Sequence, residues 1–254
     1  MQPELSIGPL ELKTFGICFA LGFVAAGLIA ARRFQELELP VDWAYELIFA
    51  GLAGGFVGAR VDYVIQNWDT ASEDLLGAAF SGAGLVWFGG LIGGAIGVLA
   101  WARWRGFLGL GLLDFTAPLI AIGYAIGRVG CQLSGDGDYG EASGLPWAMA
   151  YPDGTEPTDT EVHPTPIYES LAMGLIALVL WRLRDRLRPG LVFALWLVLS
   201  GLERLLVEFV RRNEPVAAGL TLAQLLSVAM IAAGVAWLVR ARQLPRSSTS
   251  SIQG

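Results

Sequence analysis

Three arginines fall within long apolar stretches of the sequence, where a charged side chain needs a reason to be present. Arg60, Arg128 and Arg204 each lie inside such a stretch. An arginine in hydrocarbon is costly, so each requires a partner or a function. In the topology derived below, Arg60 and Arg204 lie roughly 9 Å inside the same membrane face at ~1.5 Å per residue, with Arg128 nearer that face. We therefore predict a shared anion site, and phosphate is the anion that guanidinium groups hold best.

A glycine-rich segment surrounds Arg128 and continues beyond its apolar stretch. Residues 127–140 read GRVGCQLSGDGDYG and contain five glycines. Small residues let backbone N–H groups approach a phosphate, which places Gly130 and Asp136 in the predicted site. An ordinary helix end followed by a turn is the alternative interpretation.

Candidates for proton transfer are few. His163 is the only histidine, and an imidazole is the usual general base near neutral pH; a structural role is the alternative. Glu208 follows Arg204 by four residues and shares a helix face with it and with Arg211 or Arg212, so a structural ion pair is the alternative to a catalytic role. Glu208 and Asp136 would act as bases only if burial raised their pKa.

Small residues recur four apart in two of the apolar stretches. Gly89, Gly90, Gly93, Gly94 and Gly97 lie in one, and Gly51, Gly54, Gly55 and Gly58 lie in the other. This spacing is typical of closely packed membrane helices. Helix faces made of glycine also leave room for a lipid near the arginines.

Seven apolar stretches must position these residues. The 254-residue chain is 54% hydrophobic and 16% charged, with a mean hydropathy of +0.55, which excludes an ordinary soluble domain. We predict an all-α integral membrane protein, a single polytopic domain over residues 1–254 with seven transmembrane helices. The predicted spans are residues 9–33, 43–66, 84–104, 111–131, 166–184, 190–210 and 216–241.

The distribution of basic residues predicts the orientation. Eleven arginines fall on alternate ends and loops, which makes that face cytoplasmic. They are Arg32, Arg33, Arg103, Arg105, Arg182, Arg184, Arg186, Arg188, Arg240, Arg242 and Arg246. The N-terminus is then outside and the C-terminus cytoplasmic.

The connection over residues 132–165 is predicted to be a small extracytoplasmic head between the fourth and fifth helices. It has seven acidic residues and neither lysine nor arginine. Within it, Trp147 to Tyr151 is predicted to form a short strand entering a turn at residues 152–154. The tail over residues 245–254 is predicted to be disordered.

Several classes of partner and function are disfavoured. With Cys18 and Cys131 as the only cysteines, we expect neither a disulfide framework nor a Cys/His metal cluster. We also expect no bound metal and no cofactor. The net charge of −6 and the membrane topology disfavour nucleic acid. Retinal needs a lysine in the seventh span, whereas Lys13 is the only lysine. A transporter is disfavoured because the buried charges gather in the outer half, apart from Asp114.

Six motifs in order resemble the bacterial prolipoprotein diacylglyceryl transferases over nearly the whole chain. They are Gly58-Ala-Arg60 with Tyr63, Gly89-Gly-Leu-Ile-Gly93, Gly127-Arg128-Val-Gly130, Leu145-Pro-Trp-Ala-Met149 with Pro152-Asp-Gly154, His163-Pro with Tyr168-Glu169, and Arg204-Leu-Leu-Val-Glu208-Phe. The resemblance implies a seven-helix enzyme of the bacterial inner membrane with its active site toward the outer leaflet. Its substrates would be phosphatidylglycerol and the lipobox cysteine in the signal peptide of a prolipoprotein, and glycerol 1-phosphate would be released. Arginines matching Arg128 and Arg204 are essential in that family.

On this basis we predict two groups of site residues. Catalytic roles are predicted for Arg128, Arg204, Glu208 and His163. Substrate-binding roles are predicted for Arg60, Gly89, Gly90, Gly130, Asp136, Tyr168 and Glu169.

The sequence also departs from the family pattern. Phe88 stands where the family has histidine before Gly-Gly, Cys131 where it has asparagine, and Phe15 where it has tyrosine. Three explanations follow: His163 or a carboxylate is the base, the acceptor thiol loses its proton by other means, or the reaction has changed. Retained transfer is the reading we favour, because arginines promote ionisation of a thiol. The alternatives are a different acceptor and a non-catalytic phospholipid-binding membrane protein.

Overall fold

The residues that the structure describes form seven helices and two small strand pairs. The computed structural model describes residues 1–8, 10–68, 87–216 and 219–243. In that part of the chain, each of the seven predicted spans contains one helix. The helices are α1 (Thr14–Glu36), α2 (Asp42–Gln66), α5 (Trp87–Arg105), α6 (Leu110–Ser134), α7 (Thr165–Leu183), α8 (Leu191–Glu208) and α9 (Leu222–Gln243). The predicted tail over 245–254 and the span residues 84–86 and 217–218 lie outside the described residues.

Five of these helices have the length and composition needed to cross a membrane. They are α1, α2, α6, α7 and α9. Apolar runs of about 20 residues are what a bilayer core requires. The prediction of a mostly helical, multi-pass membrane protein is therefore confirmed.

The N-terminal residues form a hairpin instead of the start of the first helix. Strands β1 (Glu4–Ile7) and β2 (Leu10–Lys13) pair antiparallel, and α1 begins only at Thr14. The prediction that the first helical span starts at residue 9 is wrong. Residues 10–13 read Leu-Glu-Leu-Lys, and this alternation of apolar and charged residues has the period of a strand.

The chain divides into two compact units, which are described separately. One unit comprises Ala26–Leu112 and contains α2 and α5. A Cβ atom added to Gly93 would lie 2.7 Å from the Cα of Gly58, so only glycine fits at this crossing. Asp62 of α2 accepts a hydrogen bond from the backbone N–H of Gly89 (2.9 Å) at the start of α5. The predicted close packing of these helices is confirmed.

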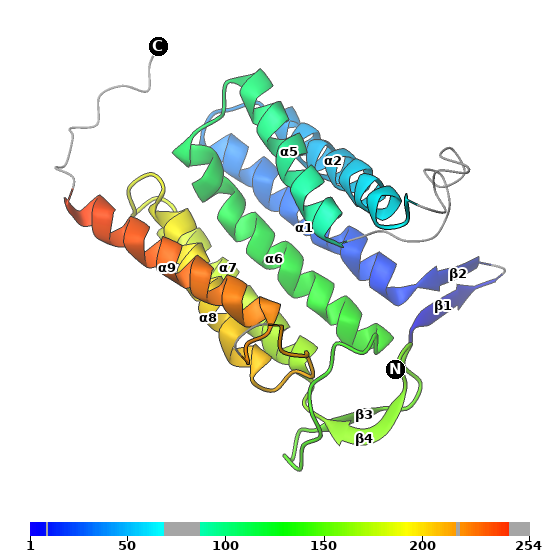
Figure 1. The fold of residues 1–254 in the computed structure, drawn as a ribbon. Helices are drawn as coiled ribbons and strands as arrows, with labels where there is room; N and C mark the ends of the chain where they lie inside the picture. Colours follow the sequence, from blue (N-terminus) through cyan, green and yellow to red (C-terminus); the bar gives the residue numbers. More distant parts are fainter. Residues whose placement is uncertain (9, 69–86, 217–218, 244–254) are drawn as a thin grey trace. The chain divides into compact units, whose positions relative to one another are not determined.

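The other unit comprises Met1–Ala25 and Leu113–Gly254 and holds the candidate site. Its helices α6, α7, α8 and α9 run side by side in Figure 1. Alanines 117, 121 and 125 on one face of α6 are buried against apolar residues of α7 and α8, which include Met173, Leu180 and Val192. The small side chains let the three helices approach closely.

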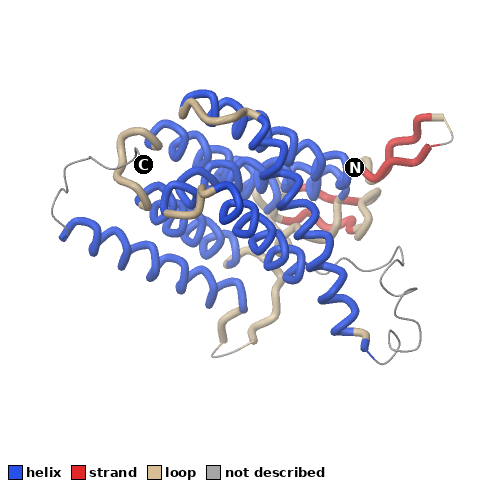
Figure 2. Tube along the Cα trace, turned by 90° about the horizontal axis from the view of Figure 1, so that it is seen from above, coloured by secondary structure: helices blue, strands red, loops and turns tan. Residues whose placement is uncertain are grey.

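The predicted strand in the head is present. Strand β3 (Met149–Tyr151) pairs antiparallel with β4 (Thr158–Val162), and both strand pairs of the molecule are coloured red in Figure 2. Tyr151 is fully buried, stacks on Tyr139 at 4.7 Å between ring centroids, and donates a hydrogen bond to Gln132 (2.9 Å). These contacts fix the head to the end of α6, where the glycine-rich segment begins.

Candidate active site

Three arginines and a buried glutamate form a cluster at one end of α6, α7 and α8. We call Arg128, Arg204, Arg211 and Glu169 the arginine cluster. Arg204 Nη1 and Arg211 Nη1 donate to Glu169 Oε1 at 2.9 and 3.1 Å. Arg128 forms an ion pair with Oε2 of the same carboxylate, and the Tyr124 hydroxyl also donates to it (3.1 Å). Glu169 is 0% exposed, so one buried carboxylate orients all three guanidinium groups.

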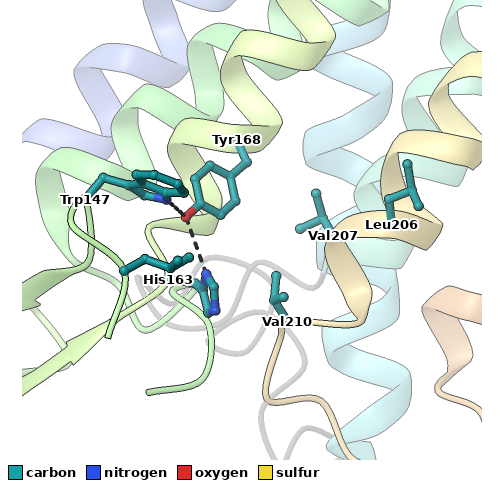
Figure 3. Close-up of a pocket in the computed structure, with 7 residues that line it drawn as sticks. Trp147, His163, Tyr168, Leu206, Val207 and Val210 are labelled. Carbon is teal, nitrogen blue, oxygen red and sulfur yellow. Dashed lines mark hydrogen bonds between the residues drawn. The ribbon is translucent and has the colours of Figure 1, made fainter. Parts of the chain in front are cut away.

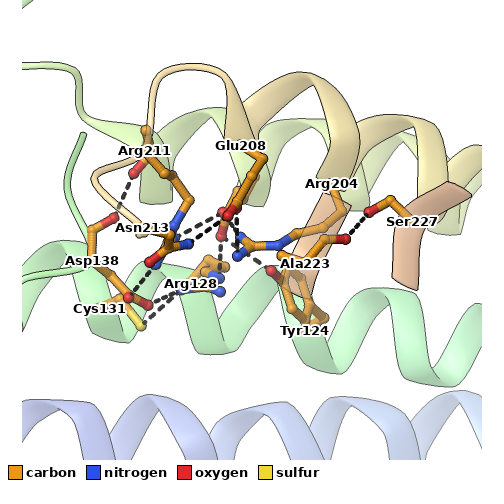
Figure 4. Close-up of polar contacts among 12 residues, drawn as sticks. Tyr124, Arg128, Cys131, Asp138, Arg204, Glu208, Arg211, Asn213, Ala223 and Ser227 are labelled. Carbon is orange, nitrogen blue, oxygen red and sulfur yellow. Dashed lines mark hydrogen bonds and ion pairs between the residues drawn. The ribbon is translucent and has the colours of Figure 1, made fainter. Parts of the chain in front are cut away.

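Two further carboxylates, those of Asp138 and Glu208, form ion pairs with arginines of the cluster (Figure 4). Asp138 pairs with Arg128 and with Arg211, the latter at 2.5 Å. Glu208 pairs with Arg204 (2.8 Å) and accepts hydrogen bonds from Asn213 and from Thr221, both at 2.7 Å.

Asp138 lies in the head and is ionised in this setting. Burial disfavours its charged form, but the opposite charges of Arg128 and Arg211 outweigh that effect and hold the pKa of the Asp138 carboxyl below its usual value. The same contacts raise the pKa of Arg211, against the opposing effect of its burial. Asp138 and Arg211 are therefore both charged near neutral pH.

Local structure explains where these side chains lie. Arg204 and Glu208 are one turn apart on α8 and share a face, as their spacing predicted. Glu169 directly follows the first turn of α7. That turn is preceded by Pro164 and contains Pro166, and proline is favoured at this end of a helix. The side chain of Arg204 is 24% exposed, against 14% for Arg128, so Arg204 is the more accessible of the two to an anionic ligand.

The glycines predicted to approach a ligand have contacts within the protein. A Cβ atom at Gly130 would lie 2.8 Å from the Cβ of Cys18 on α1, and one at Gly135 would lie 2.8 Å from the Cα of Gly154. Gly135 also has a φ of +57°, which favours glycine. The structure therefore accounts for Gly130 and Gly135 by packing and by a turn.

Asp136 contributes to the turn after α6. It accepts a hydrogen bond from the backbone N–H of Asp138 (3.3 Å). Ligand atoms of Cys131, Asp136 and Asp138 lie within 4.8 Å of one another. A cation there would meet the positive charges of Arg128 and Arg211, to which Asp138 is already paired, so this set of donors does not fit a metal site.

His163 and Tyr168 line an apolar cavity of about 430 Å³ between the head and the ends of α7 and α8 (Figure 3). The Tyr168 hydroxyl accepts a hydrogen bond from Trp147 Nε1 (2.8 Å) and lies 3.4 Å from His163 Nδ1. The rest of the lining comes from Leu145 and from Leu206, Val207 and Val210 at the end of α8. In the described part of the chain, no hydrogen bond joins the His163 ring to the arginine cluster. We call this space the head cavity.

Arg60, Gly89 and Gly90 belong to the other compact unit. There the Arg60 guanidinium lies over the Tyr63 ring, 5.7 Å from its centroid. Gly89 packs against Asp62, and a Cβ at Gly90 would lie 3.6 Å from the Cβ of Ala59. Their predicted roles in substrate binding remain predictions.

Tyr124, Asp138 and Arg211 contact the site, although their positions in the sequence did not predict a site role. Two of them have a signal in the sequence, because Tyr124 precedes Arg128 by one turn and Asp138 lies in the glycine-rich segment. Arg211 was recognised only as a possible neighbour of Glu208. Pairing across helices, which brings Arg211 to both Asp138 and Glu169, has no counterpart in sequence spacing.

Comparisons with known proteins extend over almost the whole chain. The family model described as prolipoprotein diacylglyceryl transferase matches residues 3–240. A phosphatidylglycerol–prolipoprotein diacylglyceryl transferase of Chromohalobacter salexigens is 34% identical over 251 residues, covering 95% of this chain and 92% of that protein. Proteins of the same name from Dehalococcoides mccartyi (36% identical; 91% and 89% covered) and Methylococcus capsulatus (33% identical; 93% and 94% covered) are similar. The chain therefore belongs to the prolipoprotein diacylglyceryl transferase family.

Proposed function

We propose that this protein transfers the diacylglyceryl group of phosphatidylglycerol to the lipobox cysteine thiol of prolipoproteins and releases glycerol 1-phosphate. The observation that carries the proposal is the arginine cluster, in which three guanidinium groups converge on Glu169 at the ends of membrane helices. The names of the relatives support the same donor and acceptor.

The arginine cluster matches the charge that develops in this reaction. The thiol sulfur attacks the carbon of the diacylglyceryl group that is bonded to the phosphate oxygen. This C–O bond breaks, and its electron pair leaves with the glycerol phosphate. Preoriented cations stabilise that charge without having to reorganise. Arg204 and Arg128 would bind the phosphate, with Glu169 orienting their side chains.

The structure favours a positioning role for Glu208 over the base role predicted from sequence. Glu208 is 0% exposed in its side chain and already binds Arg204, Asn213 and Thr221. These contacts already occupy both oxygens of the Glu208 carboxylate, and they hold it against Arg204. His163 and Tyr168 would serve the acceptor side, because the head cavity that they line is largely apolar, like a signal peptide.

We also propose the finer topology. Seven helices would span the bacterial inner membrane, with the N-terminus and the head outside and the C-terminus in the cytoplasm. The charge distribution along the sequence supports this orientation. The arginine cluster, which lies beside the head, would then face the outer leaflet, where the lipobox cysteine is presented.

The test is reconstitution of the purified protein with labelled phosphatidylglycerol and a lipobox peptide. We expect label on the cysteine and release of glycerol phosphate, with a loss of about 100-fold or more in Arg128→Ala and Arg204→Ala, the range for removal of a group that stabilises transition-state charge. Phe88→Ala should retain activity, and Arg186→Ala, in an exposed loop, is the matched control.

Three results would change the proposal. Full activity of Arg128→Ala would refute the mechanism. Release of glycerol phosphate without a labelled peptide would mean a different acceptor. Neither product with any of several phospholipid donors would favour a non-catalytic phospholipid-binding protein.

A further inference from the structure

Glu203 is a buried carboxylate that the arginine cluster does not use. It lies on α8 and is 8% exposed. Its Oε1 atom is fully buried and accepts no hydrogen bond from the described residues. The three neighbouring carboxylates of Asp138, Glu169 and Glu208 are all paired with arginines. A buried carboxylate without such partners is costly, which points to a functional reason for its presence.

The position of Glu203 links the head cavity with the arginine cluster. Leu206 and Val207 line the head cavity and follow Glu203 by three and four residues, so they share its face of α8. Glu203 therefore lies one helical turn, roughly 5 Å along α8, from the residues of this helix that line the head cavity. It is also close enough to Glu169 for the two charges to interact.

The charges of the arginine cluster and of Glu203 suit them to different substrates. The arginines attract the phosphate of the lipid donor, whereas the carboxylate of Glu203 repels it. A neutral thiol has no such conflict and gains an acceptor for its proton. Ser200, one turn further along the same face, is also buried, and its hydroxyl has no hydrogen-bond partner among the described residues. The polar side of α8 thus continues from Glu203 into the helix bundle.

We propose that Glu203 is the general base that takes the proton from the acceptor thiol. This inference rests on the proposed function. In the step, the S–H bond breaks and its proton moves to the Glu203 carboxylate, while the sulfur forms a bond to the glycerol carbon. The C–O bond to the phosphate breaks at the same carbon, and the departing phosphate keeps that electron pair. The protonated Glu203 then returns its proton to the phosphate or to water.

Several charged groups act on Glu203 and will shape its titration. They are Tyr124 and Arg128 from α6, Glu169 from α7, Arg204 from α8 and Arg211 beyond the end of α8. Burial and the charge of Glu169 oppose the carboxylate form that a base requires, whereas the arginines favour it. These groups remain in place in Glu203→Gln, so a comparison with that variant isolates the proton acceptor.

The test measures initial rates of transfer by the full-length protein in phosphatidylglycerol liposomes, with a lipobox peptide as acceptor. At about pH 7 we expect Glu203→Gln to be about 100-fold slower, which is within the range for loss of a general base. The difference in rate between wild type and Glu203→Gln should decrease as the pH rises past about 8.5, where the thiol ionises without a base. The KM for phosphatidylglycerol should not change. Glu161→Gln, an exposed carboxylate of β4, is the matched control and should behave as wild type.

The outcomes separate this inference from the proposed function. If the wild-type protein transfers no lipid, the proposed function fails. If the wild-type protein is active and Glu203→Gln matches it, or if the variant is equally slow at every pH, Glu203 is not the base and the function stands. Should Glu203→Gln prove unstable in detergent, Glu203→Asp keeps a carboxylate. It should then retain the wild-type pH profile at an intermediate rate, and a flat profile would overturn the inference.

Discussion

Glu169 shows how one residue can organise a charged site in a membrane protein. Its two oxygens receive Arg128, Arg204, Arg211 and Tyr124, and none of its side chain is exposed. Removing one partner of a buried ion pair costs about 3–5 kcal/mol, because the other charge is left uncompensated. The arginines are therefore held in place before any ligand arrives, as electrostatic stabilisation of a leaving group requires.

Asp138 predicts a pH dependence of stability. Its pKa is lowered in the folded protein, so its pairing stabilises the folded state above the unfolded pKa of about 3.9, and that contribution is lost as the pH falls through the folded pKa. At neutral pH, Asp138→Asn should unfold at a lower temperature than wild type in detergent. The difference should shrink as the pH is lowered toward about 3.

The measurement needs a carboxylate outside the cluster as its control. Asp159→Asn, on the exposed side of β4, should match wild type over the same pH range. A difference between Asp138→Asn and wild type that stays constant with pH would contradict the ionic role of Asp138.

At the scale of the elements, Asp114 of α6 caps α8. Its carboxylate accepts hydrogen bonds from the backbone N–H groups of Gly190 (2.5 Å) and Phe193 (2.8 Å), at the helix end that carries partial positive charge. This contact fixes the start of the helix that carries Arg204 and Glu208. These hydrogen bonds also explain why Asp114 lies apart from the other buried charges, which the sequence places in the outer half of the membrane.

Loss of this cap should destabilise the protein. Removing a capping side chain costs about 1 kcal/mol or somewhat more, so Asp114→Ala should lower the unfolding temperature in detergent. Asp114→Asn, which keeps an acceptor but loses the charge, should fall between Asp114→Ala and wild type. An Asp114→Ala variant as stable as wild type would mean that solvent or lipid replaces the cap.

The glycine stripes of α2 and α5 illustrate a different elemental constraint. Gly58 and Gly93 are placed so that a side chain on one would meet the backbone of the other. In lipid, close approach of helices gains van der Waals contact where the hydrophobic effect contributes little. The glycines at this crossing are therefore explained by packing.

At the scale of the whole molecule, α7 makes the orientation testable. It runs from the head to the loop of residues 184–190, and it is long and apolar enough to cross a membrane. The two ends of one crossing lie on opposite sides, so residues 159 and 186 should differ in accessibility. Both native cysteines are buried, which keeps background labelling low.

We expect Asp159→Cys to react with a membrane-impermeant maleimide in intact spheroplasts. Arg186→Cys should react only after the membrane is opened, because the positive-inside rule places the arginine-rich loop in the cytoplasm. The reverse pattern would invert the proposed topology and move the arginine cluster to the inner leaflet.

The sequence by itself determined the membrane character and the approximate positions of the described helices, and it predicted the arginines that would bind phosphate. Long apolar runs, the Arg204–Glu208 spacing and the glycine repeats are local signals, and each reflects a period of the helix. The start of α1 was misplaced because residues 10–13 alternate as a strand within an apolar region.

Only the tertiary structure decided which charges meet. Glu169, Asp138 and Arg211 come from three separate segments, and their pairing depends on how α6, α7 and α8 pack. The same packing left Glu203 Oε1 without a hydrogen bond from the described residues and placed His163 in the head cavity with Tyr168. Contacts between segments distant in the sequence follow from three-dimensional packing, which no local period encodes, and in this protein they separate the positioning carboxylates from the proposed base.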